Sequence, residues 1–358
     1  MSEEKEKQSG PLDAESALKA LAAVKRGLKK VYGEDTFSSK ERQFRDSIST
    51  GSAVIDAEIG NGGLATGRIH EIFGDSGSGK STLCTLVCKN AINKYPNKVV
   101  LYFDFEQAYN TEYAIDLGLN VDDPRFEFLQ PTSAEEALDI ALQFMSTGAV
   151  SLVVFDSVPA MLTKRELEKG FDEETMAEKA RFLSKALPKL LATIKETNST
   201  VLFVNQIRDK MSYGGGKTTP GGKALPFYSS TRLELSRIGI LTQKDVPYGQ
   251  IMKCYVRKNK VGRPFGVVET NLLFHKGFDY HLEIVDVARN IGLLSKSAWI
   301  ELPAEHGGEK LNGREKVTQF YRDNPEYFKS LVDMVHNYQP EHEIKEVETS
   351  KPQDEEGY

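Results

Sequence analysis

Cysteine is scarce in this 358-residue sequence, which contains only Cys84, Cys88 and Cys254. A small, odd number of cysteines argues against a disulfide framework and favours a reducing compartment, so we expect a cytoplasmic protein. Cys84 and Cys88 are four residues apart on an expected helix, but a metal site would need further ligands nearby. We therefore interpret both as small buried side chains.

Long apolar runs are lacking as well. No stretch approaches the roughly 20 consecutive apolar residues that a membrane span requires, and the first residues, MSEEKEKQSG, lack the apolar core of a signal peptide. Hydrophobic residues make up 39% of the chain and charged residues 27%, which is typical of a globular protein. We expect no membrane partner, and one large domain with smaller additions.

Charge is unevenly distributed, although the net charge is −6. Residues 208–263 contain 12 Lys or Arg and 3 Asp or Glu, a net charge of +9. Residues 340–358 contain 7 acidic and 2 basic residues, a net charge of −5. A basic segment with an acidic tail indicates a polyanionic partner for which the tail could compete. The alternative is that these charges only solvate the chain.

Strand-like and helix-like segments alternate along the middle of the chain. The expected strands are 68–74, 99–106, 151–157, 199–206, 231–239 and 251–261. Helical periodicity predicts helices at 133–148 and 179–198, the second with a kink at Pro188. The alternation predicts an α/β fold in which helices cover both faces of a mostly parallel sheet.

The two ends of the chain differ from this core, which we place at 46–283. Residues 1–45 contain an amphipathic helix at 13–32 and a polar connector, and the helix could pack on its own core or on a neighbouring subunit. Residues 284–339 predict a small C-terminal α/β domain. Residues 340–358 are polar and acidic, so we expect them to be disordered.

The segment GDSGSGKS at 74–81 fits the G-x-x-x-x-G-K-[ST] pattern of a phosphate-binding loop. An apolar strand precedes it and a helix-forming segment follows, which favours this interpretation over a plain glycine-rich turn. Backbone N–H groups would cradle the phosphates of ATP, and Lys80 would reach the β- and γ-phosphates. Ser81 or Thr82 would bind Mg²⁺. The predicted nucleotide-binding residues here are Gly74, Asp75, Ser76, Gly77, Ser78, Gly79, Lys80, Ser81 and Thr82.

Carboxylates follow two of the apolar strands. Asp156 ends the run LVVFD, where a carboxylate is costly to bury unless it is paired or near a metal, so we expect it near Mg²⁺. The alternative is a helix cap. Asp104 and Glu106 end the preceding strand, and alternation would put them on one face. Glu106, lying further past the strand, is our candidate for polarising the attacking water; the alternative is a pair of loop carboxylates.

A polar amide and a basic loop follow the strand at 199–206. Gln206 would lie close to the nucleotide, where it could sense the γ-phosphate. The next segment, MSYGGGKTTPGG at 211–222, has five glycines in 12 residues and carries Tyr213 and Lys217. Basic side chains with an aromatic on a glycine-rich loop suit a nucleic-acid backbone. An ordinary surface loop is the alternative.

Taken in order, these segments resemble the bacterial RecA recombinase family over about residues 17–338. The motifs that carry the resemblance are IHEIFGDSGSGKST, DFEQA, SLVVFDSVPAM, LFVNQIRDK, TPGGKALPFYSSTRLELSRIG, VRKNKVGRPF and REKVTQFYRDNPE. The resemblance implies a DNA-dependent ATPase that forms helical filaments on single-stranded DNA. It also implies pairing with homologous double-stranded DNA and strand exchange.

The resemblance also assigns roles to residues. Glu106 matches the residue that activates water, and Gln206 the one that links the γ-phosphate to a DNA-binding loop. Tyr113 matches the aromatic that stacks on adenine, beside Asn110. Lys258 and Lys260 match a lysine pair that reaches the nucleotide of the adjacent subunit. The implied DNA-binding residues are Met176, Arg181, Ser184, Arg208, Tyr213, Lys217, Gly221, Gly222 and Lys223.

Some positions depart from the family pattern. Pro188 replaces a basic residue, His281 replaces a tyrosine near the adenine pocket, and the loop at 208–222 is about two residues shorter. Such changes would suit a divergent member, for example one encoded by a bacteriophage and acting in the host cytoplasm. A ring-forming helicase with the same ATPase core and a nucleotide switch that binds only proteins are the rival interpretations. VRKNK and TPGGKALPFY favour the recombinase over both.

Overall fold

The computed structural model describes residues 14–32, 46–168, 178–209 and 217–338. The chain divides into two compact units, Met1–Phe44 and Arg45–Tyr358. Predictions for Met176, Tyr213 and the tail at 340–358 fall outside the described residues. No helix in the described parts of the chain is long and apolar enough to cross a membrane.

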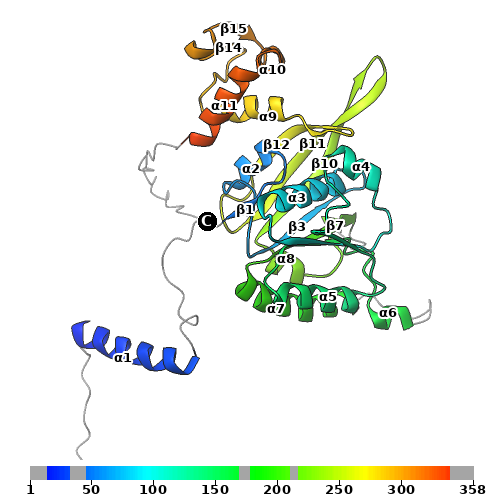
Figure 1. Cartoon of the computed structure of the whole chain (residues 1–358), viewed down its shortest axis with the longest axis vertical. Coiled ribbons are helices and arrows are strands. Elements are labelled where there is room, and N and C mark those ends of the chain that lie inside the picture. Colours follow the sequence, from blue (N-terminus) through cyan, green and yellow to red (C-terminus); the bar gives the residue numbers. More distant parts are fainter. Residues whose placement is uncertain (1–13, 33–45, 169–177, 210–216, 339–358) are drawn as a thin grey trace, which may run out of the picture. The chain divides into compact units, whose positions relative to one another are not determined.

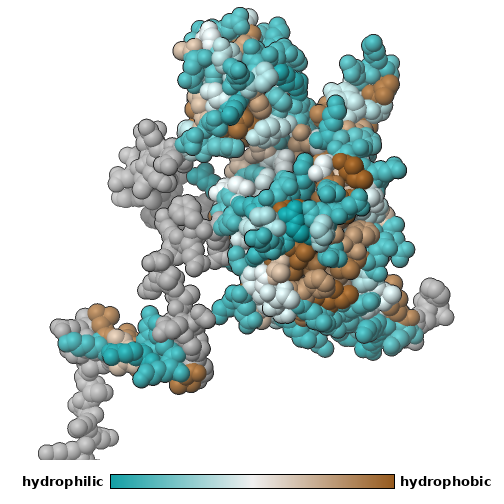
Figure 2. Space-filling view, viewed as in Figure 1, coloured by the Kyte–Doolittle hydropathy of each residue, from teal (hydrophilic) through white to brown (hydrophobic). Residues whose placement is uncertain are grey.

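In the first unit, the described residues form a helix, α1 (Ala14–Tyr32), at the place where the sequence predicts one. Its apolar residues recur at helical spacing, yet Leu18, Leu21 and Val24 remain 67%, 65% and 58% exposed. Figure 2 shows apolar residues at the surface of α1 among hydrophilic ones. An apolar stripe on a helix is normally buried against another element, and no other described element of this unit covers the stripe of α1.

A nine-stranded sheet forms the centre of the larger unit, in the order β13-β12-β11-β10-β3-β7-β6-β4-β5 (Figure 1). The strands from β10 to β5 in this order pair in parallel, and β11, β12 and β13 are antiparallel. The strands are β3 (Ile69–Gly74), β4 (Val99–Asp104), β5 (Phe126–Leu129), β6 (Val150–Asp156), β7 (Thr200–Gln206), β10 (Thr231–Gln243), β11 (Val246–Asn259), β12 (Val267–Leu273) and β13 (Gly277–Phe278). The predicted α/β class and mostly parallel sheet are confirmed.

Helices cover both faces of this sheet, because its buried strands alternate side chains between two apolar cores. One core holds residues of α2 (Ala53–Ile59), α3 (Lys80–Lys94) and α4 (Thr111–Asp116). The other core holds residues of α5 (Ala134–Ser146), α7 (Glu178–Thr197) and α8 (Ala224–Tyr228). Figure 1 shows α3 on one side of β3 and β7, and α5 and α7 on the other. Cys84 and Cys88 are buried, as predicted, and Cys254 is buried as well; all three are free thiols.

Two short strand pairs and a short helix lie outside the central sheet. They are β1 (Ser47–Ile48) with β2 (Leu64–Ala65), β8 (Arg208–Asp209) with β9 (Lys217–Thr218), and the short helix α6 (Lys164–Glu168). β8 and β9 pair antiparallel, so the two described ends of the glycine-rich loop are joined as a hairpin stem.

A third apolar core gathers the C-terminal elements α9 (Tyr280–Asn290), α10 (Arg314–Asp323) and α11 (Pro325–Asn337). They accompany the hairpin of β14 (Trp299–Glu301) and β15 (Lys310–Asn312) and a 3-10 turn at Ala304–His306. This separate core is what a small C-terminal domain at 284–339 would require, although α9 begins a few residues earlier, at Tyr280.

Two details differ from the sequence predictions. The expected strand to 106 ends at Asp104, so strand alternation does not extend to Glu106. The helical region at 313–338 divides into α10 and α11, because Pro325 has no N–H to continue a helix and keeps Asn324 out of the helical conformation (φ −128°, ψ 76°). The helix α7 is continuous through Pro188, and the kink expected there stays a prediction.

Candidate functional site

The phosphate-loop motif lies where β3 ends and α3 begins. Gly77 and Gly79 have φ values of 69° and 94°, a left-handed conformation that other residues rarely adopt. Gly74 is required for a different reason, since a Cβ there would lie 2.1 Å from the carbonyl oxygen of Leu235 in β10. The glycines therefore allow a tight turn that opens directly onto the N-terminus of α3, where backbone N–H groups favour an anion.

Lys80 is the first residue of α3, and its ammonium folds back onto the loop. Nζ donates to the carbonyl oxygens of Gly74 (3.1 Å) and Asp75 (2.8 Å). Burial lowers the pKa of Lys80, while the charges of Asp156 and Glu106 oppose that effect. A phosphate would offer this ammonium stronger acceptors than the two carbonyls do.

The two hydroxyls after Lys80 lie in different surroundings. Ser81 is exposed at the start of α3. Thr82 is buried, and its Oγ1 lies 3.3 Å from the hydroxyl of Tyr113. Since the Thr82 hydroxyl is engaged with Tyr113, Ser81 is the better candidate of the two for a magnesium ligand.

Asp156 ends β6 and is 8% exposed. Its Oδ2 accepts a hydrogen bond of 2.6 Å from the hydroxyl of Tyr102. Burial raises the pKa of Asp156 to about 6, an effect that this hydrogen bond opposes and the charges of Glu106 and Asp104 reinforce. A cation would stabilise the anionic form of this buried carboxylate, which lies near other carboxylates. Asp156 is therefore suited to be a ligand of Mg²⁺.

Asp104 and Glu106 have separate tasks. The carboxylate of Asp104 accepts backbone N–H bonds from Glu106 (3.1 Å), Gln107 (3.0 Å) and Tyr109 (3.3 Å), so it shapes the loop after β4. The side chain of Glu106 is exposed and accepts from the hydroxyl of Ser157. The carboxylate of Glu106, rather than that of Asp104, is thus the one available to a water molecule.

Gln206, the last residue of β7, connects this carboxylate to that strand. Its Nε2 donates to Oε1 of Glu106 over 3.1 Å. The neighbouring Asn205 accepts from the backbone N–H of Gln206 (2.9 Å) and donates to the carbonyl of Pro220 (3.0 Å) and to Glu71 (2.9 Å). Residues 205 and 206 therefore join the strand end beside Glu106 to the C-terminal end of the glycine-rich loop.

A groove of about 420 Å³ runs from the phosphate loop to Tyr113. Its walls are formed by Gly77, Gly79, Lys80, Ser81, Thr82, Tyr113, Arg237, Gln250, Leu272 and Phe274. Asn110 is the N-cap of α4, where its Oδ1 accepts from the backbone N–H of Tyr113 (2.9 Å). Asn110 therefore supports the helix turn that carries Tyr113.

Lys258 and Lys260 are not part of this groove. The ammonium of Lys258 donates to the carbonyls of Pro226 (2.7 Å) and Phe227 (2.8 Å) at the end of α8, and Lys260 lies 3.5 Å from the latter. Burial and the neighbouring charges of Lys260 and Arg232 lower the pKa of Lys258. The structure thus separates the lysine pair from the phosphate loop of the same chain.

The glycine pair of the predicted DNA-binding loop packs on α7. A Cβ at Gly221 would lie 2.6 Å from Leu183, and one at Gly222 would lie 2.9 Å from the Cβ of Ala180. Both glycines also have positive φ values, 93° and 74°. This close packing places them beside the first turns of α7, which carry Arg181 and Ser184, and Lys223 follows as the N-cap of α8.

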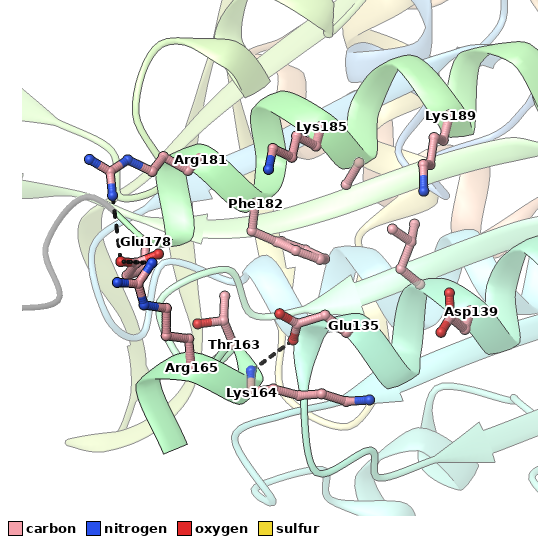
Figure 3. A pocket seen from close by; sticks show the side chains of 12 residues that line it. Glu135, Asp139, Thr163, Lys164, Arg165, Glu178, Arg181, Phe182, Lys185 and Lys189 are labelled. Carbon is pink, nitrogen blue, oxygen red and sulfur yellow. Dashed lines mark hydrogen bonds and ion pairs between the residues drawn. The ribbon is translucent and has the colours of Figure 1, made fainter. Parts of the chain in front are cut away.

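A basic groove of about 560 Å³ lies between α5, α6 and the first half of α7 (Figure 3). Arg181, Lys185 and Lys189 follow one another at four-residue spacing along α7, so they lie close to one face of that helix. Glu178 forms ion pairs with Arg181 (3.5 Å) and Arg165 (3.3 Å). These three cations line the groove on both sides of Pro188 in sequence, although Pro188 itself replaces a basic residue of the family pattern.

Sequence comparison identifies the family. The RecA N-terminal domain family matches residues 19–279. A relative named Protein RecA, from Campylobacter jejuni, is 37% identical over 329 residues, covering 89% of this chain and 93% of its own. Protein RecA from Rickettsia bellii is 35% identical over 323 residues, covering 88% and 92%.

The chain belongs to the RecA family. Membership makes it a DNA-dependent ATPase of homologous recombination. This finding sets aside the protein-only nucleotide switch and the ring helicase as interpretations. The relatives named here are bacterial proteins, so an origin in a bacteriophage stays a prediction.

Sequence reasoning missed three residues of this RecA site. Tyr102 and Ser157 bind the carboxylates of Asp156 and Glu106, and Asn205 connects Gln206 to Pro220. Only Asn205 had a local signal, because it is a polar residue at the end of an apolar strand beside Gln206.

Proposed function

We propose that ATP binds with its phosphates on the loop at 74–81 and its base against Tyr113. Lys80 exchanges its two carbonyl partners for phosphate oxygens, and the groove from the loop to Tyr113 supplies the space. Glu106 then polarises the attacking water, and Gln206 contacts the γ-phosphate. Glu106, Lys80 and Gln206 are the proposed catalytic residues.

Mg²⁺ fits the same site with few protein ligands. The donors are the hydroxyl of Ser81 and, directly or through water, the buried carboxylate of Asp156, whose raised pKa favours a neighbouring cation. No cluster of three or more His, Cys, Asp or Glu side chains suited to a metal occurs among the residues with described positions. Most of the coordination would come from phosphates and water, as Mg²⁺ prefers. When bound, the ion supplies charge neutralisation on the phosphates.

We further propose that each ATP is bound between two protomers of a filament. Lys258 and Lys260 lie away from the loop of their own chain, so they are available to the nucleotide of a neighbour. The exposed apolar face of α1 is suited to docking on a neighbouring protomer, which gives residues 1–45 their role in assembly. A repeated head-to-tail contact of this kind generates a helical filament rather than a closed pair.

Single-stranded DNA is proposed to bind along α7 and the glycine-rich loop. The proposed contacts within the described part of the chain are Arg181, Ser184, Arg208, Lys217, Gly221, Gly222 and Lys223. The close packing of Gly221 and Gly222 on α7 supports a DNA-binding surface shared by the loop and that helix. Homologous double-stranded DNA is the second partner, with which strands are exchanged.

The observation that carries this mechanism is the connection from Glu106 through Gln206 and Asn205 to Pro220. A γ-phosphate that draws Gln206 away from Glu106 removes one of the two donors to Oε1 of that carboxylate and changes the anchor of the DNA-binding loop. Linkage is reciprocal, so DNA must favour the ATP-bound arrangement as strongly as ATP favours DNA binding.

Electron microscopy with single-stranded DNA and a slowly hydrolysed ATP analogue tests the assembly. Helical filaments are expected with both ligands. Closed rings or isolated particles under those conditions would rule out the proposed assembly.

A further inference from the structure

A contact between His275 and Asp116 lies beside Tyr113, one of the residues that line the nucleotide groove. Nδ1 of His275 lies 2.5 Å from Oδ2 of Asp116, the last residue of α4. The imidazole also meets the ring of Tyr113 in a T-shaped arrangement, with centroids 5.2 Å apart and planes at 71°. The contact thus joins α4 to the turn between β12 and β13, through two residues that are 159 positions apart in sequence.

This turn is part of the groove wall. Phe274, the residue before His275, lines the groove. His275 itself has a φ of 61°, a left-handed conformation, and its side chain reaches from the turn to α4. Phe274 and Tyr113, which both line the groove, are therefore linked through the contacts of His275.

Stability of the fold does not account for the pair. The two side chains are 65% and 46% exposed, and exposed ion pairs contribute little to folding. Asp116 also lies at the C-terminal end of α4, where the helix dipole disfavours a carboxylate. What the pair does is fix the imidazole against Tyr113, whose hydroxyl is already held by Thr82 at 3.3 Å.

We propose that His275 and Asp116 form a clip that positions the Tyr113 ring for the purine base of ATP. The proposal rests on the proposed function, in which Tyr113 stacks on adenine. A ring held at its hydroxyl and by a T-shaped contact with the imidazole loses little freedom when the base arrives, so the clip strengthens binding. The clip does not touch the phosphates, so His275 and Asp116 are positioning residues rather than catalytic ones.

ATP hydrolysis by the full chain on saturating single-stranded DNA tests the clip. Asp116→Ala removes the acceptor, and His275→Asn removes the ring while suiting the left-handed backbone. Each should raise the half-saturating ATP concentration about three- to tenfold and leave the maximal rate unchanged. Asp116→Asn retains an oxygen that can accept from Nδ1–H, so it should stay closer to the wild type than Asp116→Ala.

Inhibition by inorganic tripolyphosphate separates positioning of the base from a general disturbance. Tripolyphosphate has no base, so its inhibition constant should be the same in the clip variants and the wild type. Glu301→Ala removes another exposed ion pair, Glu301 with Lys310, and serves as the matched control. Equal losses for ATP and tripolyphosphate, or the same change in Glu301→Ala, would overturn the clip.

Tyr113→Ala distinguishes the two levels of the proposal. It should weaken ATP binding, and adding Asp116→Ala in that background should cause no further loss. If Tyr113→Ala binds ATP normally, stacking on adenine fails and the clip fails with it. If Tyr113→Ala is impaired while the clip variants match the wild type, the clip alone is refuted.

Discussion

Gln206, the last residue of β7, donates a hydrogen bond of 3.1 Å to the carboxylate of Glu106, which lies 100 positions earlier and just past the end of β4. The same oxygen, Oε1, accepts from Ser157, which follows Asp156. In this arrangement one oxygen of the proposed base accepts from both an amide and a hydroxyl. A ligand that attracts Gln206 would change the hydrogen bonding of Glu106, the proposed base. It would also act on the end of β7, from which Asn205 binds the DNA-binding loop at Pro220.

Glu106→Gln is expected to bind ATP but hydrolyse it at least about 100-fold more slowly, because an amide cannot accept a proton from water. Steady-state hydrolysis and equilibrium ATP binding, both with single-stranded DNA, measure the two effects. Glu112→Gln makes the same chemical change on exposed α4 and should leave turnover unaltered. Normal turnover by Glu106→Gln would assign the base to another residue.

Gln206→Ala is expected to separate ATP binding from DNA binding. The variant keeps the phosphate loop, so its affinity for ATP without DNA should stay within about twofold of the wild type. It loses the bond to Glu106, so ATP should no longer increase its affinity for single-stranded DNA, nor DNA its rate of hydrolysis. Fluorescence anisotropy of a labelled oligonucleotide, with and without a slowly hydrolysed ATP analogue, measures the coupling. A wild-type response to the analogue would contradict the proposed connection.

The parts of this site that sequence predicts are those encoded locally. The phosphate loop is a contiguous motif whose glycines are required by backbone geometry, and Asp156 follows an unbroken apolar strand. Glu106 is the candidate base because it lies further past the strand than Asp104, and its role stays a prediction. The expectation that strand alternation puts Asp104 and Glu106 on one face was wrong, because the strand ends at Asp104. Asp104 ends the strand and binds the next backbone N–H groups, which turns Glu106 off the strand line.

The parts that sequence could not predict depend on contacts between distant segments. No local pattern shows that Tyr102 binds Asp156, that Thr82 faces Tyr113, or that His275 reaches Asp116. The hairpin of β10 and β11 extends further than expected because Lys244 and Asp245 both adopt positive φ (49° and 62°). Such a two-residue turn usually needs Gly or Asn, so its sequence gave no signal.

Mixing two inactive variants tests whether the ATP site is shared between protomers. Lys80→Ala lacks a working phosphate loop but keeps both lysines, and Lys258→Ala/Lys260→Ala has the reverse defect. In a random filament about one interface in four would combine an intact loop with an intact lysine pair. An equal mixture should therefore recover about a quarter of wild-type ATPase activity per protomer, whereas each variant alone stays inactive. No recovery in mixed filaments would place all essential groups within one chain.

The buried carboxylate of Glu283 predicts how stability depends on pH. It lies in α9 and accepts from Ser52 Oγ (2.6 Å), the Ala53 N–H (2.8 Å) and Thr270 Oγ1 (2.5 Å). Burial raises its pKa to about 7, although these hydrogen bonds oppose the shift. The folded state therefore holds this proton more tightly than the unfolded state does.

The pKa of this carboxyl is near 4.5 in the unfolded chain and about 7 in the folded one. Between pH 4.5 and about pH 7, the contribution of Glu283 to the free energy of unfolding therefore falls as pH rises. Glu283→Gln keeps an oxygen acceptor without the charge, so it should remove that fall and gain on the order of 2–3 kcal/mol relative to the wild type above pH 7. Urea unfolding at several pH values measures the difference, with Glu305→Gln, an exposed carboxylate, as the control. If the free energy of unfolding differs between Glu283→Gln and the wild type by the same amount at pH 5 and pH 8, the proton at Glu283 does not control stability.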